Sequence, residues 1–366
     1  MLTSILVFFL ILSILVLVHE FGHYWVAKKN GIWVEEFGFG LPPRVLGKKI
    51  GETIYSINLL PFGGFVRLHG ENEIENSDKD LSRAFLSKSK KARFAVVVAG
   101  VIMNFLLAIF AFAIVYSFSG VPRETGQVKI VGINPDTPAA ESGLKDGDIV
   151  LKIDGKDAKM ANDVILEVTE KGGKHSLEVK SGDVIKNFEV DTVKNEENGK
   201  WYMGVILTSL EIYYPPVWQR PFYGMYYGFK DALFWGETVI MGFVSIFQNL
   251  FKGEVPKDIA GPVGIFAISS ETSKMGILAV INFIGILSVN LAILNIIPFP
   301  ALDGGRLLFI GLESIFGKKV LPKIENYAHS IGFILLLGLL VAITYHDIRR
   351  LIFAGGIEGF INSMVQ

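Results

Sequence analysis

Four long runs without a charged residue place the strongest constraint on how this chain can fold. They occupy residues 1–18, 94–122, 275–302 and 326–346. The first continues to Ala27 with Glu20 as its only charged residue. A helix that crosses a bilayer needs about 20 predominantly apolar residues and satisfies its backbone hydrogen bonds internally. The runs therefore predict an α-helical polytopic membrane protein with about four transmembrane helices, and the low charged fraction of 19% agrees.

Two hydrophobic segments allow more than one interpretation. The first run could be a signal peptide, but a His-Glu-Phe-Gly-His sequence follows it in place of a small-residue cleavage site. Residues 222–251 contain Lys230, Asp231 and Glu237 together with many aromatic residues, which favour the membrane interface. We expect this segment to lie on or partly in the membrane, with a fifth span as the alternative.

Charge balance and cysteine content exclude several classes of function. The chain has 35 Lys and Arg against 36 Asp and Glu, a net charge of −1. A nucleic-acid-binding protein needs a basic surface, so nucleic acid is not an expected partner. Because there are no cysteines, disulfides, thiolate catalysis and cysteine-ligated zinc are all excluded.

The charges beside the runs predict an orientation. Basic residues lie close to the ends of the first two runs, at 28–29 and 88–93, and positive ends mark the cytoplasmic side. The segment 121–210, after the second run, is then expected outside. Arg349 and Arg350 disagree with this rule, because four spans would place them outside as well.

This orientation divides the chain into four parts. They are 1–120, with two spans and a cytoplasmic loop; 121–210, an external domain; 211–274, a membrane-associated amphipathic segment; and 275–366, with the last two spans and a C-terminal tail. The division predicts one domain inserted between two pairs of transmembrane helices.

A His19-Glu20-Phe21-Gly22-His23 motif lies at the end of the first run. Histidines at i and i+4 stack on one helix face, close enough to share a metal ion. Zinc suits two imidazoles and one carboxylate with a fourth position open for water, and Glu20 could take a proton from that water. A chance match at a helix end is the alternative, but an ionised Glu20 in an apolar run costs at least about 2.5 kcal/mol. The motif therefore predicts a zinc site.

The third ligand is expected where the third run ends. Pro298 and Pro300 break the helix there, and Asp303 closes the run. Broken backbone at membrane depth is tolerated only where it is buried in protein or lines a wet cavity. Alone, Asp303 would be interpreted as a helix-terminal acid at the interface. However, the first and third runs cross the membrane in the same direction, so that His19 and Asp303 both reach the inner side.

These paired motifs resemble the site-2 protease family of intramembrane zinc metalloproteases, in particular the bacterial regulator of sigma-E type. The resemblance covers nearly the whole chain. Its elements are residues 19–23, Asn295 with Pro298 and Asp303-Gly304, 37–40, 60–67, 98–100, 104–108 and 261–264. The chain departs from the family at Val101, where proline is common, and in having one external domain where the regulator of sigma-E protease has two.

The resemblance implies roles for individual residues. His19, His23 and Asp303 would bind Zn²⁺, and Glu20 would be the catalytic base. Asn295 would bind the substrate backbone near the scissile bond, with a helix-to-helix contact as its alternative. Such a contact is the interpretation we favour for Asn104. Further substrate-binding residues implied by the glycine element and the membrane-entering loop are Gly38, Gly40, Gly63, Gly64 and Phe65.

Residues 54–59 and 65–68 flank a bend at Pro61 and Gly63-Gly64, and this pattern predicts a membrane-associated β-hairpin. A helical substrate must unwind before attack, and the free edge of the hairpin could hold it as an added strand. The alternative is a plain cytoplasmic hairpin on the inner membrane face.

The external part has a signature of its own, since residues 131–148 resemble a bacterial PDZ domain. Expected elements are strands at 128–133, 149–153 and 177–179, a hairpin turn at Asp154-Gly155, and a short helix from Pro138 to Gly143. A PDZ domain can bind a peptide or a C-terminus as an added strand. A spacer that excludes bulky proteins is the alternative.

Together these features predict an intramembrane zinc metalloendopeptidase that cleaves transmembrane segments of single-span membrane proteins, for example anti-sigma factors or signal-peptide remnants. We expect a multi-pass protein of the bacterial cytoplasmic (inner) membrane, with the active site toward the cytoplasm and the PDZ domain outside. Expected partners are the lipid bilayer, the substrates and a peptide at the PDZ domain. A non-catalytic PDZ-bearing membrane scaffold and a transporter with broken helices are the alternatives.

Overall fold

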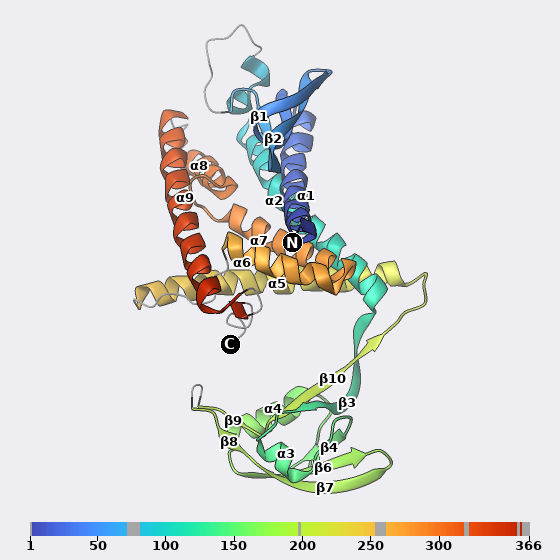
Figure 1. Cartoon of the computed structure of the whole chain (residues 1–366). Helices are drawn as coiled ribbons and strands as arrows, with labels where there is room; N and C mark the ends of the chain where they lie inside the picture. The colour runs from blue at the N-terminus through green and yellow to red at the C-terminus, as the bar shows by residue number, and fades with distance from the viewer. Residues whose placement is uncertain are drawn as a thin grey trace. The chain divides into compact units, whose positions relative to one another are not determined.

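The computed structural model describes residues 2–71, 81–196, 199–252, 261–317, 322–356 and 359–360. The chain forms two compact units. One contains residues 1–119 and 217–366 and is mainly helical, and the other contains residues 120–216 and is an α+β domain (Figure 1).

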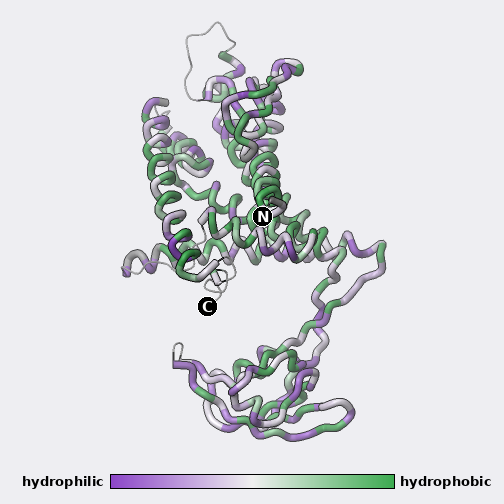
Figure 2. Tube along the Cα trace, in the orientation of Figure 1, coloured by the Kyte–Doolittle hydropathy of each residue, from purple (hydrophilic) through white to green (hydrophobic). Residues whose placement is uncertain are grey.

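Within the described residues, four helices are long and apolar enough to cross a membrane. They are α1 (Leu2–Lys29), α2 (Lys90–Ser119), α7 (Ile277–Ile296) and α9 (Pro322–Phe353). Figure 2 shows hydrophobic residues, in green, along much of these helices. The prediction of about four transmembrane helices is therefore confirmed at this level.

Two of the predicted runs end as helices earlier than hydropathy alone indicates. α2 stops at Ser119, because Gly120 adopts a left-handed φ of +82° and a strand begins at Val121. α7 stops at Ile296, because Pro298 and Pro300 have no N–H to donate to a continuing helix. Residues 297–302 form a non-helical loop instead.

The aromatic segment forms one long helix, α5 (Arg220–Phe251), which is not among the candidate spans. Figure 1 shows it running across the direction of α1 and α2. It packs closely on α2 through glycines, since a Cβ at Gly224 would lie 2.4 Å from the carbonyl oxygen of Ala113. A position on or partly in the membrane stays a prediction for this helix.

Shorter helices complete this unit. They are α6 (Pro262–Met275), α8 (Asp303–Phe316) and the 3-10 turns η1 (Leu81–Arg83) and η2 (Phe85–Ser87). Asp347 of α9 accepts the N–H of Gly264 at 2.9 Å and so caps the first turn of α6. Sequence analysis assigned no helix to α6 or α8, since neither is long enough to stand out as a span.

The loop between α1 and α2 contains a small sheet built from β1 (Val34–Ile50) and β2 (Thr53–Leu68). Residues 36–39 pair on one side with 64–67 and on the other with 54–57. The predicted hairpin, in which 54–59 would pair with 65–68, is therefore wrong. The limb 34–40 lies between them, and its alternating burial is typical of a central strand that local turn signals do not reveal.

This strand order makes residues 64–68 a strand at the edge of the sheet, which we call the edge limb. A buried apolar cluster packs that edge against α1 and α2. Its buried members are Ala27, Ile32, Val34, Leu68, Phe85, Val96, Val97 and Ile310. Residues 64–68 are thereby held beside α1, the helix that carries His19, Glu20 and His23.

The second unit is a five-strand sheet path with two helices. Its elements are β3 (Val121–Ile133), α3 (Pro138–Ser142), β4 (Ile149–Ile153), β5 (Lys156–Asp157), α4 (Ala161–Glu170), β6 (Lys174–Ser181), β7 (Val184–Asp191), β8 (Val193–Lys194), β9 (Trp201–Tyr202) and β10 (Val205–Tyr213). The strand order is β10-β3-β4-β6-β7, with β5 paired to β4. The predicted strands, the turn and the short helix are confirmed, with Gly143 ending α3 at φ +85°.

Candidate metal centre

α1 carries the two histidines on one face, as their spacing predicts. The Nε2 atoms of His19 and His23 lie 3.1 Å apart, and both side chains are buried. A helix with residues at i and i+4 presents them one turn apart, so this proximity is a local consequence of the α1 backbone.

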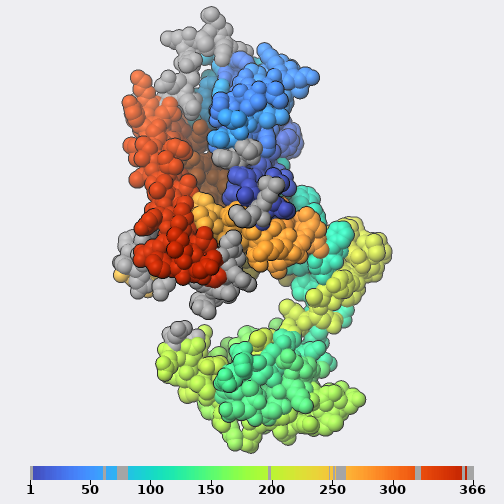
Figure 3. Space-filling model, viewed as in Figure 1, coloured from blue at the N-terminus to red at the C-terminus, as the bar shows by residue number. Residues whose placement is uncertain are grey.

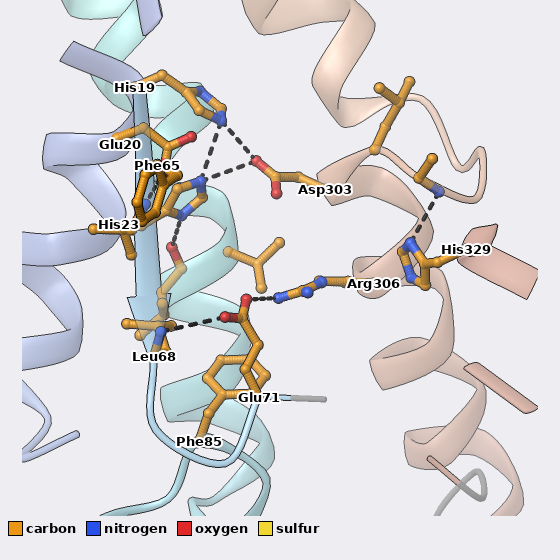
Figure 4. A pocket seen from close by; sticks show the side chains of 15 residues that line it. His19, Glu20, His23, Phe65, Leu68, Glu71, Phe85, Asp303, Arg306 and His329 are labelled. Carbon is orange, nitrogen blue, oxygen red and sulfur yellow. Dashed lines mark hydrogen bonds and ion pairs between the residues drawn. The ribbon is translucent and has the colours of Figure 1, made fainter. Parts of the chain in front are cut away.

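Asp303 comes from the far end of the chain to the same place. It is the first residue of α8, directly after the proline-broken loop. Its Oδ2 lies 3.1 Å from the Nε2 of His19 and 3.2 Å from that of His23 (Figure 4). The three side chains form the potential metal-ligand group found among the described residues. The structure thus brings together the three predicted ligands.

The three ligand atoms suit a zinc ion. Ligands about 2.0–2.1 Å from a tetrahedral zinc lie about 3.3 Å from one another, close to the separations found here. Apart from the two imidazoles, the buried Oδ2 of Asp303 has no hydrogen-bond partner among the residues that the structure describes. Three atoms with lone pairs therefore face one another, an arrangement that a cation at their centre would explain.

The other nitrogen of each imidazole is directed by α2. His23 Nδ1 lies 2.8 Å from the carbonyl oxygen of Val96, so Nδ1 carries the proton and Nε2 keeps its lone pair. His19 Nδ1 lies 3.3 Å from Asn104 Nδ2, while the buried Asn104 Oδ1 has no partner within the described part of the chain. Exchanging the amide oxygen and nitrogen gives His19 Nδ1–H an acceptor and pairs the orphaned oxygen. Both rings then present Nε2 to a metal.

Glycines on α1 and α2 make this approach possible. A Cβ at Gly100 would lie 2.5 Å from His23 Nε2, and one at Gly22 would lie 2.4 Å from the carbonyl oxygen of Ala99. A larger residue at Gly22 would have to move the α2 backbone, and one at Gly100 would have to displace the imidazoles of His19 and His23. Sequence analysis noted Gly100 only as part of a family motif, without this packing role.

Glu20 points into the same space from α1. Its Oε2 accepts the N–H of Val66 on the edge limb of the sheet at 3.0 Å. The carboxylate therefore links the helix of the histidines to the sheet, next to the group formed by His19, His23 and Asp303 (Figure 4).

These residues surround a cavity of about 220 Å³. Its other polar members are Glu71, Arg306 and His329. Arg306 forms an ion pair with Glu71, whose Oε2 also accepts the N–H of Leu68 at 3.3 Å. None of these three residues was predicted from the sequence. Two of them could have been found from the sequence, because a polar residue at membrane depth is costly and marks a functional site. His329 is a lone histidine inside an apolar run, and Arg306 follows Asp303 by one helical turn.

The predicted substrate-binding residues lie in different places. Phe65 lines the cavity. Gly64 approaches α1, where its Cβ would lie 3.3 Å from Leu17. Gly38 and Gly40 instead allow close packing within the sheet, because a Cβ at Gly38 would lie 2.5 Å from the Phe65 ring and one at Gly40 would lie 2.4 Å from the carbonyl oxygen of Leu60. Gly63 forms a bend at φ +78°, and Asn295 lies partly exposed in the last turn of α7, outside the residues that line the cavity.

Comparison with known proteins agrees with this geometry. The chain matches peptidase family M50 over residues 7–339. A Clostridium perfringens protein that bears the name putative zinc metalloprotease is 36% identical over 92% of this chain and 96% of its own length. The zinc metalloprotease RasP of Oceanobacillus iheyensis is 30% identical over 95% of this chain and 99% of its own.

A solved PDZ domain of an SdrC-like protein from Listeria monocytogenes covers 24% of the chain and 93% of that domain at 25% identity, with a TM-score of 0.22. The family match and the relatives extend over nearly the whole chain, and the family match includes every residue that lines the cavity. This multi-pass membrane protein therefore belongs to peptidase family M50, the site-2 proteases, and is a zinc metalloprotease.

Proposed function

We propose that the protein is an intramembrane endopeptidase that cleaves transmembrane segments of single-span membrane proteins. The observation that carries the proposal is the convergence of His19, His23 and Asp303 beside Glu20 in one cavity. The histidines lie on a candidate span, and Asp303 follows another. A peptide bond could be hydrolysed there within the membrane's depth, in a polar space that lipid does not fill.

Each side chain has a role in this proposal. His19, His23 and Asp303 would hold zinc, which would polarise the scissile carbonyl and lower the pKa of a bound water to about 7. Glu20 would accept the proton of the attacking water and pass it to the leaving amine. Val66 N–H holds the Glu20 carboxylate in place until a substrate binds.

The edge limb of the sheet is the strand to which we propose that the substrate binds. Val66 and Leu68 both direct their N–H groups toward the cavity, where Glu20 and Glu71 accept them. Residues i and i+2 of a strand share one direction, so an unwound substrate could pair here as an added strand. Its carbonyl groups would replace the two carboxylates, and its scissile bond would lie beside the metal ligands.

A substrate screen tests the proposal most directly. The Glu20→Gln variant, expected to bind but not cleave, would be used to trap membrane proteins from native membranes. Single-span proteins that are trapped and that the wild-type protein cuts within or near their helix support the proposal. Cleavage confined to soluble proteins would contradict it.

The amide of Asn104 provides a graded prediction for metal binding. Outer partners of metal-bound histidines typically contribute 10–100-fold to metal affinity. Asn104→Leu is therefore expected to weaken zinc binding about 10–100-fold, whereas Asn104→Asp keeps an acceptor for His19 Nδ1–H and should bind like wild type. Chelator competition measures the affinity. Asn290→Leu is the matched control, since its amide bonds within its own helix.

Orientation in the membrane forms a second part of the proposal. We infer from the positive ends of the first two runs that the catalytic side faces the cytoplasm and residues 120–216 face outward. The chain has no cysteine, so single cysteines report cleanly. A cysteine at Ser142 should react with an impermeant thiol reagent in intact cells. One at Ser77, which lies outside the described residues, should react only after the membrane is opened; the reverse pattern would invert the topology.

The outer domain, proposed to be a PDZ domain, would control access rather than chemistry. It supplies none of the proposed metal ligands. A folded domain of about 100 residues has a radius of gyration of about 13 Å, large enough to exclude substrates with bulky external parts. Capture of a peptide at the domain is the alternative role.

Deleting residues 127–207 tests this role. The cut leaves Val121 to Glu124 paired with Leu210 to Tyr213 as a stem. Zinc content and cleavage of a trimmed single-span substrate should persist, and substrates with large external domains should become cleavable. The measurement compares both substrates in one membrane assay. Loss of cleavage of the trimmed substrate by a folded, zinc-loaded deletion variant would instead make the domain a required binding element.

A further inference from the structure

The loop that precedes Asp303, residues 297–302, is bonded to α9 through the side chain of His329. Residues 297–302 contain two prolines without an N–H. The N–H groups of Ile297, Phe299 and Leu302 bond to carbonyl oxygens of α7 or of the loop itself. The remaining donor, Ala301 N–H, bonds to Nδ1 of His329 at 2.9 Å (Figure 4).

Ala301 needs such support because of its backbone conformation. Its φ is +80°, a left-handed value that brings Cβ close to the following carbonyl oxygen and that residues other than glycine rarely adopt. Conformations of this kind persist where the surroundings hold them. Ala301 lies two residues before Asp303, so any relaxation of its backbone would redirect the carboxylate.

α9 touches the loop at a second point one turn further along. A Cβ at Gly332 would lie 2.4 Å from the carbonyl oxygen of Pro300, so the α9 backbone lies directly against the loop. The rest of α9 is largely uncovered, and its side chains form one side of the helical unit (Figure 3). The contact with the loop is therefore a docking point separate from the one near the other end of α9, where Asp347 is buried against α6.

We propose that His329 is a positioning residue for the metal ligand Asp303. By accepting the N–H of Ala301, it holds the loop in its left-handed form and directs the carboxylate at His19 and His23. The proposal rests on the proposed role of Asp303 as a ligand. It also makes metal affinity depend on the seating of α9 against residues 300–301.

The side-chain geometry allows a sharp pair of variants. Asparagine places an acceptor oxygen at the δ position, where His329 Nδ1 lies, whereas glutamine places it one atom further out. His329→Asn should therefore retain wild-type zinc affinity. His329→Gln and His329→Leu should lose about 10–100-fold, the usual effect of removing a group that orients a metal ligand.

A rescue variant separates positioning from general folding. Ala301→Gly removes the Cβ that makes φ +80° unfavourable, so the loop should keep its form without the hydrogen bond. Adding Ala301→Gly to His329→Leu should restore most of the zinc affinity. His346→Leu, exposed on the same helix, should leave zinc affinity unchanged.

Zinc affinity would be measured on the full-length protein by chelator competition, with thermal unfolding recorded alongside. Wild-type affinity in His329→Leu would overturn the proposal, as would equal losses in the asparagine and glutamine variants or failure of the glycine rescue. If Asp303→Ala kept full zinc occupancy, the ligand assignment itself would fall. Loss of zinc in Asp303→Ala together with wild-type affinity in His329→Leu would overturn the positioning role alone.

Discussion

Glu20→Gln is expected to retain zinc and to lose cleavage by about 10²–10⁴-fold, the usual contribution of a general base. Glutamine has the same shape, and its amide oxygen can still accept the N–H of Val66 that Glu20 accepts in the structure. The cavity and the three ligand side chains should therefore stay in place. The amide cannot take a proton from water, so the chemical step alone is removed.

The measurement pairs metal analysis of the purified variant with cleavage of a single-span substrate. Glu237→Gln is the matched control, since Glu237 is an exposed acid on α5 and does not line the cavity. It should cleave like wild type. Substantial cleavage by Glu20→Gln would show that another group serves as the base, and loss of zinc would show that Glu20 helps to hold the metal.

His23→Ala and Asp303→Ala are each expected to lose both zinc and cleavage. Removing either leaves two of three ligand atoms, and the remaining pair no longer encloses a tetrahedral site. The expected loss is therefore close to complete for occupancy at micromolar zinc as well as for activity.

Metal analysis after dialysis checks this expectation, and cleavage is assayed on the same preparations. His346→Ala, a histidine exposed on α9, provides the control and should keep full occupancy. If Asp303→Ala kept full zinc, the third ligand would have to be another group of the cavity.

Much of this protein could be predicted from local pattern. The charge-free runs correspond to α1, α2, α7 and α9, because a helix in lipid depends on the hydropathy of its own residues. The histidine pair could be predicted for the same reason, since i and i+4 are neighbours on any α-helix. The two prolines similarly predicted the break before Asp303.

Other features depend on residues far apart in the chain. The strand order of the loop sheet escaped prediction because residues 34–40 insert between two segments that look like a hairpin by themselves. The roles of Gly100 and Asn104 follow from how closely α2 approaches α1, and helix propensity carries no information on that distance.

The sequence by itself thus determined the candidate spans, the spacing of His19 and His23, and the chemistry of the ligand set. The tertiary structure alone decided that Asp303 meets the histidines at 3.1–3.2 Å, and that Val66 and His329 reach Glu20 and the Asp303 loop. The physical reason is the distance along the chain over which each effect acts. Hydropathy and helical periodicity act within a few turns of one helix, whereas these contacts arise when separate helices and an edge strand pack around one polar cavity.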